Sequence, residues 1–300
     1  MKYFYLLLIL ISSLYANEYK EYKVGFAQDT LANEWRQSQV DDVINESLKY
    51  PFLKLTIKDA KKELSKQIQD IEYFIKKDYD FIITSPINPK ITSIVLKKAI
   101  KKGIKVILID RGISSDDYTS FISPDNTKIA QEAAKYLANK LNYKGTILML
   151  EGVKNATPTI LRTEGFMSII SKYKDIKVIT RRANYQRGDA IKVANQLFKD
   201  GEKFDAIFSQ SDSMLMGVRF AMKKHKIKKE FLTVGIDYIE ASKSAILNGE
   251  QDVSFTYDTC GKEGVELIVD IINNKKIEKN YILKSTMVTK ENANQIKPIF

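Results

Sequence analysis

Short apolar runs without a polar break recur along this chain, and amphipathic stretches of helical period separate most of them. A run such as Val106–Ile109 has no polar face, so both of its faces must be buried. In the intervening stretches apolar residues share one helix face, as Leu64, Ile68 and Ile71 do. Strands buried on both faces and alternating with helices predict parallel sheets covered by helices on both sides. The runs lie at 24–27, 52–57, 81–84, 106–109, 146–150, 178–180, 206–208 and 231–236.

One interruption divides this pattern into two parts. A short strand at 119–122 is followed by Ser-Pro-Asp-Asn, in which Asp125 or Asn126 can cap the next helix. New strand–helix units then follow, and Pro124 provides a stiff point for the chain to cross over. We therefore expect an α/β fold with two doubly wound parallel-sheet lobes.

The first residues differ from the rest of the chain. Lys2 is followed by the apolar run Phe4–Ile11 and then by small and semi-polar residues up to Ala16. The run is shorter than the roughly 20 residues that span a bilayer. Residues 1–16 are therefore expected to be a cleaved secretory signal peptide and not a membrane anchor.

Cysteine and histidine narrow the possible functions. The single cysteine, Cys260, allows no internal disulfide and lies far from the position where a lipid is attached to an exported protein. We expect a diffusible protein of a Gram-negative periplasm.

The single histidine is His225. One histidine and one cysteine are too few residues for Cys–His catalysis or for a His/Cys zinc site. We expect no metal and no cofactor.

The net charge of +11 comes from 48 basic and 37 acidic residues. The lysines are scattered over nearly every predicted helix and do not concentrate on one element, as a nucleic-acid surface would require. This distribution is typical of solvated helix faces, so no nucleic-acid partner is expected.

Ligands of open parallel sheets bind at the carboxyl ends of the strands. In this chain aromatic, amide and charged residues gather at these positions. Arg162 lies at the start of the apolar face of a predicted helix, where a cation needs a polar partner. Trp35 lies off the apolar face of its own helix, which suggests that it belongs to a contact surface. The candidates are Trp35, Arg36, Asn88, Asp110, Arg111, Arg162, Tyr185, Ser211, Asp212 and Asp237.

Several candidates also have a purely structural interpretation. An aspartate before a helix can be an N-cap, an asparagine beside a proline can be a turn residue, and a tyrosine can belong to the core. Adjacent Asp and Arg residues can form a structural ion pair. These alternatives apply to Asp212 and Asp237, to Asn88, to Tyr185, and to Asp110 with Arg111.

Taken together, the candidates suit a sugar. A sugar ring has an apolar C–H face that Trp or Tyr can cover, and a rim of hydroxyl groups that both donate and accept. Carboxylates accept, arginines donate in a fork and asparagine does both, so planar side chains can bind neighbouring hydroxyls.

The order of these motifs also resembles a known family. The segments "YKVGFAQDTLANEWRQSQ", "DFIITSPINPK", "KGIKVILIDRGI", "FISPDNTKIAQEAAKYLA", "FSQSDSMLMG" and "LTVGIDY" stand where the motifs of the periplasmic sugar-binding proteins of the ribose/galactose type do. Trp35-Arg36 makes the galactofuranose-binding branch the nearest. By motif position the resemblance implies ligand roles for Trp35, Arg36, Asn88, Asp110, Arg111, Arg162, Tyr185 and Asp237.

The chain departs from the family pattern in two places. Ser211-Asp212 stands where the family usually has Asn-Asp. Thr256 or Tyr257 stands where a Gln or Glu often faces the sugar. These departures leave the identity of the ligand open.

The resemblance implies a type I periplasmic binding protein whose lobes are joined by a three-stranded hinge. The N-terminal lobe is expected at 17–123 plus 256–284, and the C-terminal lobe at 124–255 plus 285–300. The implied function is that of a monomer, without enzymatic activity, that delivers a monosaccharide to an ABC transporter permease. The alternative is a subunit that presents a sugar or furanose autoinducer to a chemoreceptor or sensor kinase.

Overall fold

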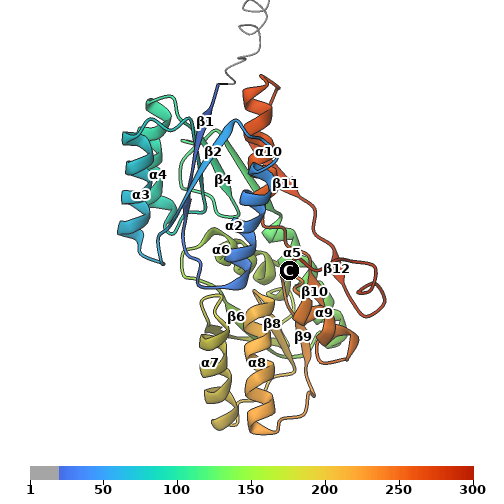
Figure 1. The fold of residues 1–300 in the computed structure, drawn as a ribbon. Coiled ribbons are helices and arrows are strands. Elements are labelled where there is room, and N and C mark those ends of the chain that lie inside the picture. The colour runs from blue at the N-terminus through green and yellow to red at the C-terminus, as the bar shows by residue number, and fades with distance from the viewer. Residues whose placement is uncertain (1–19) are drawn as a thin grey trace, which may run out of the picture.

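The structure, a computed structural model, describes residues 20–300, and it consists of two lobes that each contain a parallel sheet (Figure 1). The expected signal peptide, residues 1–16, lies outside the described residues. Within 20–300 no helix combines the length and apolar character needed to cross a membrane.

The sheet of the N-terminal lobe has six strands in the order β11-β5-β4-β3-β1-β2, and every neighbouring pair is parallel. It comprises β1 (Tyr22–Gln28), β2 (Leu53–Asp59), β3 (Phe81–Thr84), β4 (Lys105–Ile109), β5 (Ser120–Pro124) and β11 (Asn280–Leu283).

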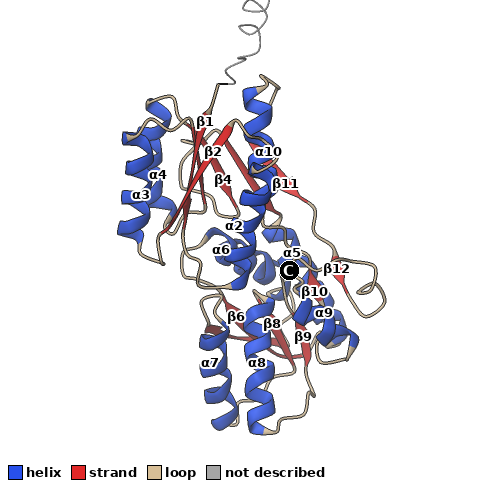
Figure 2. Ribbon diagram, in the orientation of Figure 1, coloured by secondary structure: helices blue, strands red, loops and turns tan. Residues whose placement is uncertain are grey.

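Helices cover both faces of this sheet (Figure 2). On one face α2 (Glu34–Ser47) and α10 (Gly261–Ile272) pack Val43 and Val265 against strand residues such as Ile107. On the other face lie α3 (Leu64–Lys76) and α4 (Pro89–Lys101).

The C-terminal lobe repeats this arrangement around four parallel strands in the order β7-β6-β8-β9. Its strands are β6 (Gly145–Glu151), β7 (Ile176–Arg182), β8 (Ala206–Ser209) and β9 (Leu232–Val234). Its helices are α5 (Asn126–Lys140) and α6 (Thr157–Ile170) on one face, α7 (Arg187–Lys199) and α8 (Asp212–His225) on the other, and α9 (Glu240–Leu247). The predicted fold class of two doubly wound parallel-sheet lobes is confirmed.

Segments from three parts of the chain lie at the hinge between the lobes. Asp125 accepts a hydrogen bond from Lys128 N at 2.9 Å and so caps α5, directly after β5. The strands β10 (Ser254–Phe255) and β12 (Met287–Val288) pair antiparallel, close to the C-terminus in Figure 1. The lobe boundaries expected from the sequence remain a proposal.

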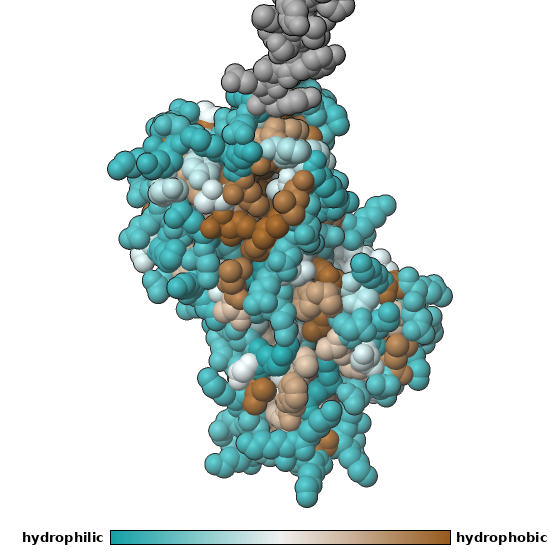
Figure 3. Space-filling model, viewed as in Figure 1, coloured by the Kyte–Doolittle hydropathy of each residue, from teal (hydrophilic) through white to brown (hydrophobic). Residues whose placement is uncertain are grey.

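The surface in Figure 3 is mostly hydrophilic, with an apolar area on the upper lobe in the region of β2 and α2. β2 is an edge strand, and its side chains beyond Leu53 are exposed or half-buried. Lys54 and Lys58 lie along this edge, where charge opposes pairing with another chain.

Candidate ligand-binding site

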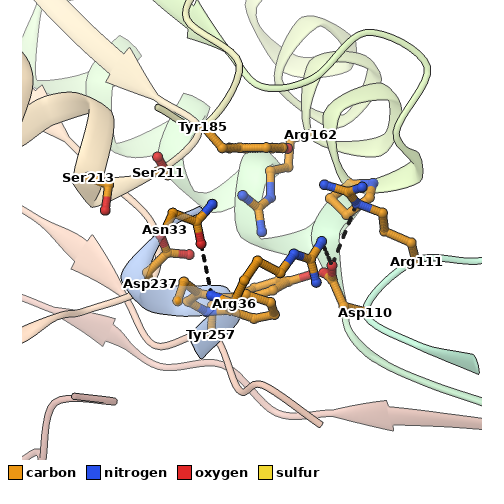
Figure 4. A pocket seen from close by; sticks show the side chains of 12 residues that line it. Asn33, Arg36, Asp110, Arg111, Arg162, Tyr185, Ser211, Ser213, Asp237 and Tyr257 are labelled. Carbon is orange, nitrogen blue, oxygen red and sulfur yellow. Dashed lines mark hydrogen bonds and ion pairs between the residues drawn. The ribbon is translucent and has the colours of Figure 1, made fainter. Parts of the chain in front are cut away.

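A cavity with an empty volume of about 440 Å³ lies where the two lobes and the hinge meet (Figure 4). Its walls come from segments that follow strands β1 and β4 in one lobe, from α6, from segments that follow β7, β8 and β9, and from the hinge. It is lined by Asn33, Trp35, Arg36, Asp110, Arg111, Pro158, Arg162, Tyr185, Ser211, Ser213, Asp237 and Tyr257.

Four charged side chains form a buried network on the N-terminal side. Arg36 donates a hydrogen bond from Nη2 to Asp110 at 2.8 Å, and its Nε lies 3.0 Å from Asp29. Arg111 donates from Nη1 to the other oxygen of Asp29 at 2.8 Å. Asp110 and Arg111 are therefore not a simple ion pair. Arg111 Nε lies 3.8 Å from Asp110 Oδ2, and each of the two charged groups has a nearer partner of opposite charge.

Asp110 is bound on both oxygens. Tyr257 donates its hydroxyl to Oδ1 at 2.8 Å, while Arg36 occupies Oδ2. Burial acts to raise the pKa of Asp110, but Arg36 and Arg111 outweigh it and leave the pKa below its ordinary value. Asp110 is therefore a fixed carboxylate in the cavity wall.

Arg162 faces the cavity from the C-terminal lobe. Its Nε donates to Asn126 Oδ1 at 2.8 Å, and its Nη1 donates to the carbonyl oxygen of Gln210. The guanidinium carbon lies 4.3 Å from the ring centre of Tyr257, within the range of a cation–π contact. These contacts provide the polar partners that the sequence position of Arg162 requires.

Asp237 differs from Asp110 because no side chain in the described part of the chain donates a hydrogen bond to its carboxyl group. Burial raises the pKa of Asp237 well above its ordinary value, Arg162 acts in the opposite direction, and the carboxylates of Asp212 and Asp110 add to the rise. Asp237 thus lines the cavity as a buried group with spare hydrogen-bonding capacity.

Aromatic rings complete the cavity walls. The ring centres of Trp35 and Tyr257 are 5.8 Å apart. Trp35 is only 9% exposed, and within residues 20–300 its Nε1 has no hydrogen-bond partner. It lies off the core of its own lobe, as predicted, and packs into the core of the C-terminal lobe. Tyr185 is half-buried, and its hydroxyl lies 2.8 Å from Thr159 Oγ1.

Of the candidates from the sequence, Trp35, Arg36, Asp110, Arg111, Arg162, Tyr185, Ser211 and Asp237 line the cavity, and three others do not. Asn88 caps α4 by accepting from Lys90 N and Ile91 N at 3.0 Å. Thr256 joins the hinge, where its backbone N–H donates to Thr286 O at 3.0 Å. Asp212 is fully buried behind the wall of the cavity, and Ser211, not Asp212, is the cap of α8.

The sequence did not single out three lining residues, Asn33, Pro158 and Ser213, and it also missed Asp29. Tyr257 was one of two alternatives with Thr256, and only a structure could decide which neighbour faces the cavity. Asn33 caps α2 through Arg36 N at 2.8 Å, and a capping pattern ahead of Trp35 is the signal that could have located it. Pro158 and Ser213 lie in the first turns of α6 and α8 and carry no distinctive pattern.

The lobes contact each other directly around the cavity. Gly112 N donates to Thr157 Oγ1 at 3.1 Å, from the N-terminal to the C-terminal lobe. Arg187 Nη2 at the start of α7 lies 2.5 Å from Glu34 Oε2 at the start of α2. The arrangement is therefore a closed one, in which both lobes cover the cavity.

No group of three or more His, Cys, Asp or Glu residues within 20–300 is arranged to bind a metal ion. Cys260 is buried in the apolar core of the N-terminal lobe, consistent with a packing role.

Comparisons with known proteins agree with this fold. Residues 24–276 match the family described as periplasmic binding protein domain. The chain is 27% identical over 263 residues to the ribose import binding protein RbsB of Bacillus subtilis, covering 87% of this chain and 85% of the relative. It is 27% identical over 241 residues to the galactofuranose-binding protein YtfQ of Escherichia coli, covering 77% and 76%.

Among solved structures, one similar protein is the fructose-binding periplasmic domain of the hybrid two-component system BT1754. The two chains are 32% identical and superpose with a TM-score of 0.86, over 92% of this chain and 93% of that domain.

Proposed function

Because the chain belongs to the family of periplasmic binding protein domains, we propose that it captures a monosaccharide between its lobes and delivers it to an ABC importer. The observation that carries this proposal is the cavity to which both lobes and the hinge contribute lining residues. The match of residues 24–276 supports a binding protein and not an enzyme.

The cavity offers the two kinds of contact that a sugar needs. Trp35, Tyr185 and Tyr257 provide ring faces for its C–H groups, and the charged side chains provide fixed donors and acceptors for its hydroxyls. Because Asp110 and Arg36 are already bound to protein groups, a ligand needs to satisfy only the remaining positions of these side chains.

The balance of formal charge favours a neutral ligand. Arg36, Arg111 and Arg162 contribute three positive charges, and Asp29, Asp110 and Asp237 can contribute three negative ones. The charges on the N-terminal side are paired among themselves, so they strengthen hydrogen bonds to a neutral sugar without requiring a charged one.

A second function is favoured by one comparison. The fructose-binding periplasmic domain with 32% identity belongs to a hybrid two-component system, as its description states. The same cavity could therefore present a sugar to a chemoreceptor or sensor kinase. The two functions share the ligand site and differ only in the membrane partner.

Two experiments test the proposals. Thermal unfolding of the chain from residue 17 onward should be screened against neutral pentoses and hexoses, including sugars that populate furanose rings. A ligand at one hundred times its dissociation constant should add about 2.7 kcal/mol to the free energy of unfolding. If no monosaccharide shifts the transition, the sugar-binding function is wrong. Uptake of the identified sugar by cells lacking the protein then separates the roles, because import fails only if the protein serves a transporter.

A further inference from the structure

Asp212 is fully buried at the start of α8, and its carboxyl group faces the loop that follows β9. Its Oδ2 accepts hydrogen bonds from Tyr238 N at 2.8 Å and from Ser254 Oγ at 2.5 Å. Its Oδ1 accepts from Gln251 Nε2 at 2.8 Å. One carboxylate therefore joins α8, the loop after β9 and the hinge strand β10.

The loop that Asp212 contacts has an unfavourable backbone conformation. Asp237 has a φ of 117° and Tyr238 a φ of 54°, and neither residue is a glycine. Such conformations are unfavourable for residues other than glycine and persist only where surrounding contacts enforce them. Phe255 O accepts from Asp237 N at 2.9 Å, and the buried Tyr238 hydroxyl donates to Ala293 O at 2.7 Å.

The surroundings of Asp212 fix the position of its carboxyl group. A Cβ atom on Gly235 would lie 1.9 Å from Asp212 Oδ1, so the close approach of the carboxylate requires glycine there. Arg219 donates to Gln251 Oε1 at 2.7 Å, which leaves the Gln251 amide NH₂ facing Asp212.

We propose that Asp212 is a positioning residue that acts on the sugar only through Asp237. By accepting from Tyr238 N, it keeps the backbone of Asp237 and Tyr238 in the conformation that directs the Asp237 carboxyl into the cavity. Asp212 itself does not line the cavity. This inference rests on the proposed sugar-binding function, and it replaces the ligand role that the sequence assigned to Asp212.

A double-mutant cycle distinguishes this role from a general structural one. Asp212→Asn in the wild-type background should weaken sugar affinity about 10-fold, the factor expected for one hydrogen bond to a charged group. In the Asp237→Asn background the same change should have an effect of less than about 2-fold, because the group it positions has already been altered. Calorimetric titration of the four proteins gives this comparison.

The matched control is Asp252→Asn. Asp252 Oδ2 accepts from Thr233 N and Thr233 Oγ1, both at 2.8 Å, so the control removes a similar carboxylate beside the same strand β9. It should lower stability without changing affinity. If Asp212→Asn does not fold, Ser254→Ala replaces it in the cycle. This change removes a donor to the Asp212 carboxylate and also the second acceptor of Tyr238 N, which lies 3.1 Å from Ser254 Oγ.

A readout without sugar separates this inference from the proposed function. Hydrogen exchange of the Tyr238 amide should become faster in Asp212→Asn than in Asp252→Asn. Unchanged exchange, unchanged affinity, or an equal loss of affinity in both backgrounds would overturn the positioning role. If the wild-type protein binds no monosaccharide, the proposed function fails, while the exchange measurement still decides whether Asp212 holds the loop.

Discussion

Arg36 Nη2 lies 2.8 Å from Asp110 Oδ2 in the buried wall of the cavity. The sequence left open whether Asp110 serves a ligand or a structural ion pair. The geometry supports both, because the carboxylate is bound by Arg36 and Tyr257 and also lines the cavity. Its partner in the ion pair is Arg36 and not its neighbour Arg111.

We expect Asp110→Asn to lower stability as well as affinity. The change removes the partner of a buried arginine, and breaking a buried pair typically costs about 3–5 kcal/mol. Thermal unfolding without ligand and calorimetry with the identified sugar measure the two effects. Wild-type stability in this variant would mean that Asp29 alone can neutralise Arg36 and Arg111.

Asp237→Asn should have the opposite effect on stability. The pKa of Asp237 is raised in the folded chain, which therefore binds more protons than the unfolded chain above the ordinary value of 3.8. Stability then falls as pH rises from that value through the raised pKa, and the asparagine variant lacks this loss. The variant should unfold at a higher temperature at neutral pH, with the difference vanishing near pH 3. It should still bind sugar at least about 10-fold more weakly. Parallel stability–pH curves for the two proteins would contradict this expectation.

The contact between Glu34 and Arg187 should favour closure without touching the sugar. Exposed ion pairs contribute about 0.2–1 kcal/mol, so Glu34→Gln should weaken affinity by at most about 5-fold, and by the same factor for every sugar. Reversing both charges, Glu34→Arg with Arg187→Glu, should restore affinity. The control is Lys192→Gln, which disrupts an exposed pair with Asp189 inside α7. A sugar-dependent effect would place Glu34 in the ligand site instead.

Glu263 should make stability depend on pH near neutrality. Burial and then the repulsion of Asp258 raise its pKa from 4.5 to about 7. The folded chain therefore retains a proton that the unfolded chain has lost, and stability should fall as pH rises from about 4.5 to about 7. Glu263→Gln should flatten this part of the stability–pH curve and leave sugar affinity unchanged, since Glu263 does not line the cavity. The exposed Glu164→Gln is the control, because Glu164 lies on α6 and is not among the groups that raise the pKa of Glu263. If Glu263→Gln retains the wild-type slope, another group titrates in this range.

The alternation of apolar runs and helices was sufficient to predict both sheets, because strands buried on two faces have a distinctive pattern. β11 was missed as a strand because its residues alternate between exposed and half-buried positions at the edge of the sheet. Its pairing with β5 depends on a contact between distant parts of the chain.

Strand ends located most of the cavity, but not the direction of each side chain. Asn88 follows β3, yet Pro89 begins a helix there and the asparagine caps it. Asp29 escaped notice because its importance comes from Arg36 and Arg111, which only the fold brings to it. The local sequence pattern therefore predicts which loops reach the site. The hydrogen bonds and ion pairs between side chains of different loops can be found only from the structure.

The central claim, that this cavity binds a neutral monosaccharide, is tested most directly by calorimetric titration of the wild-type protein and Asp237→Asn with the sugar found by thermal screening. We expect one sugar per chain for the wild type and affinity at least about 10-fold weaker for the variant. Equal affinity in the two proteins, or the absence of any binding sugar, would contradict it.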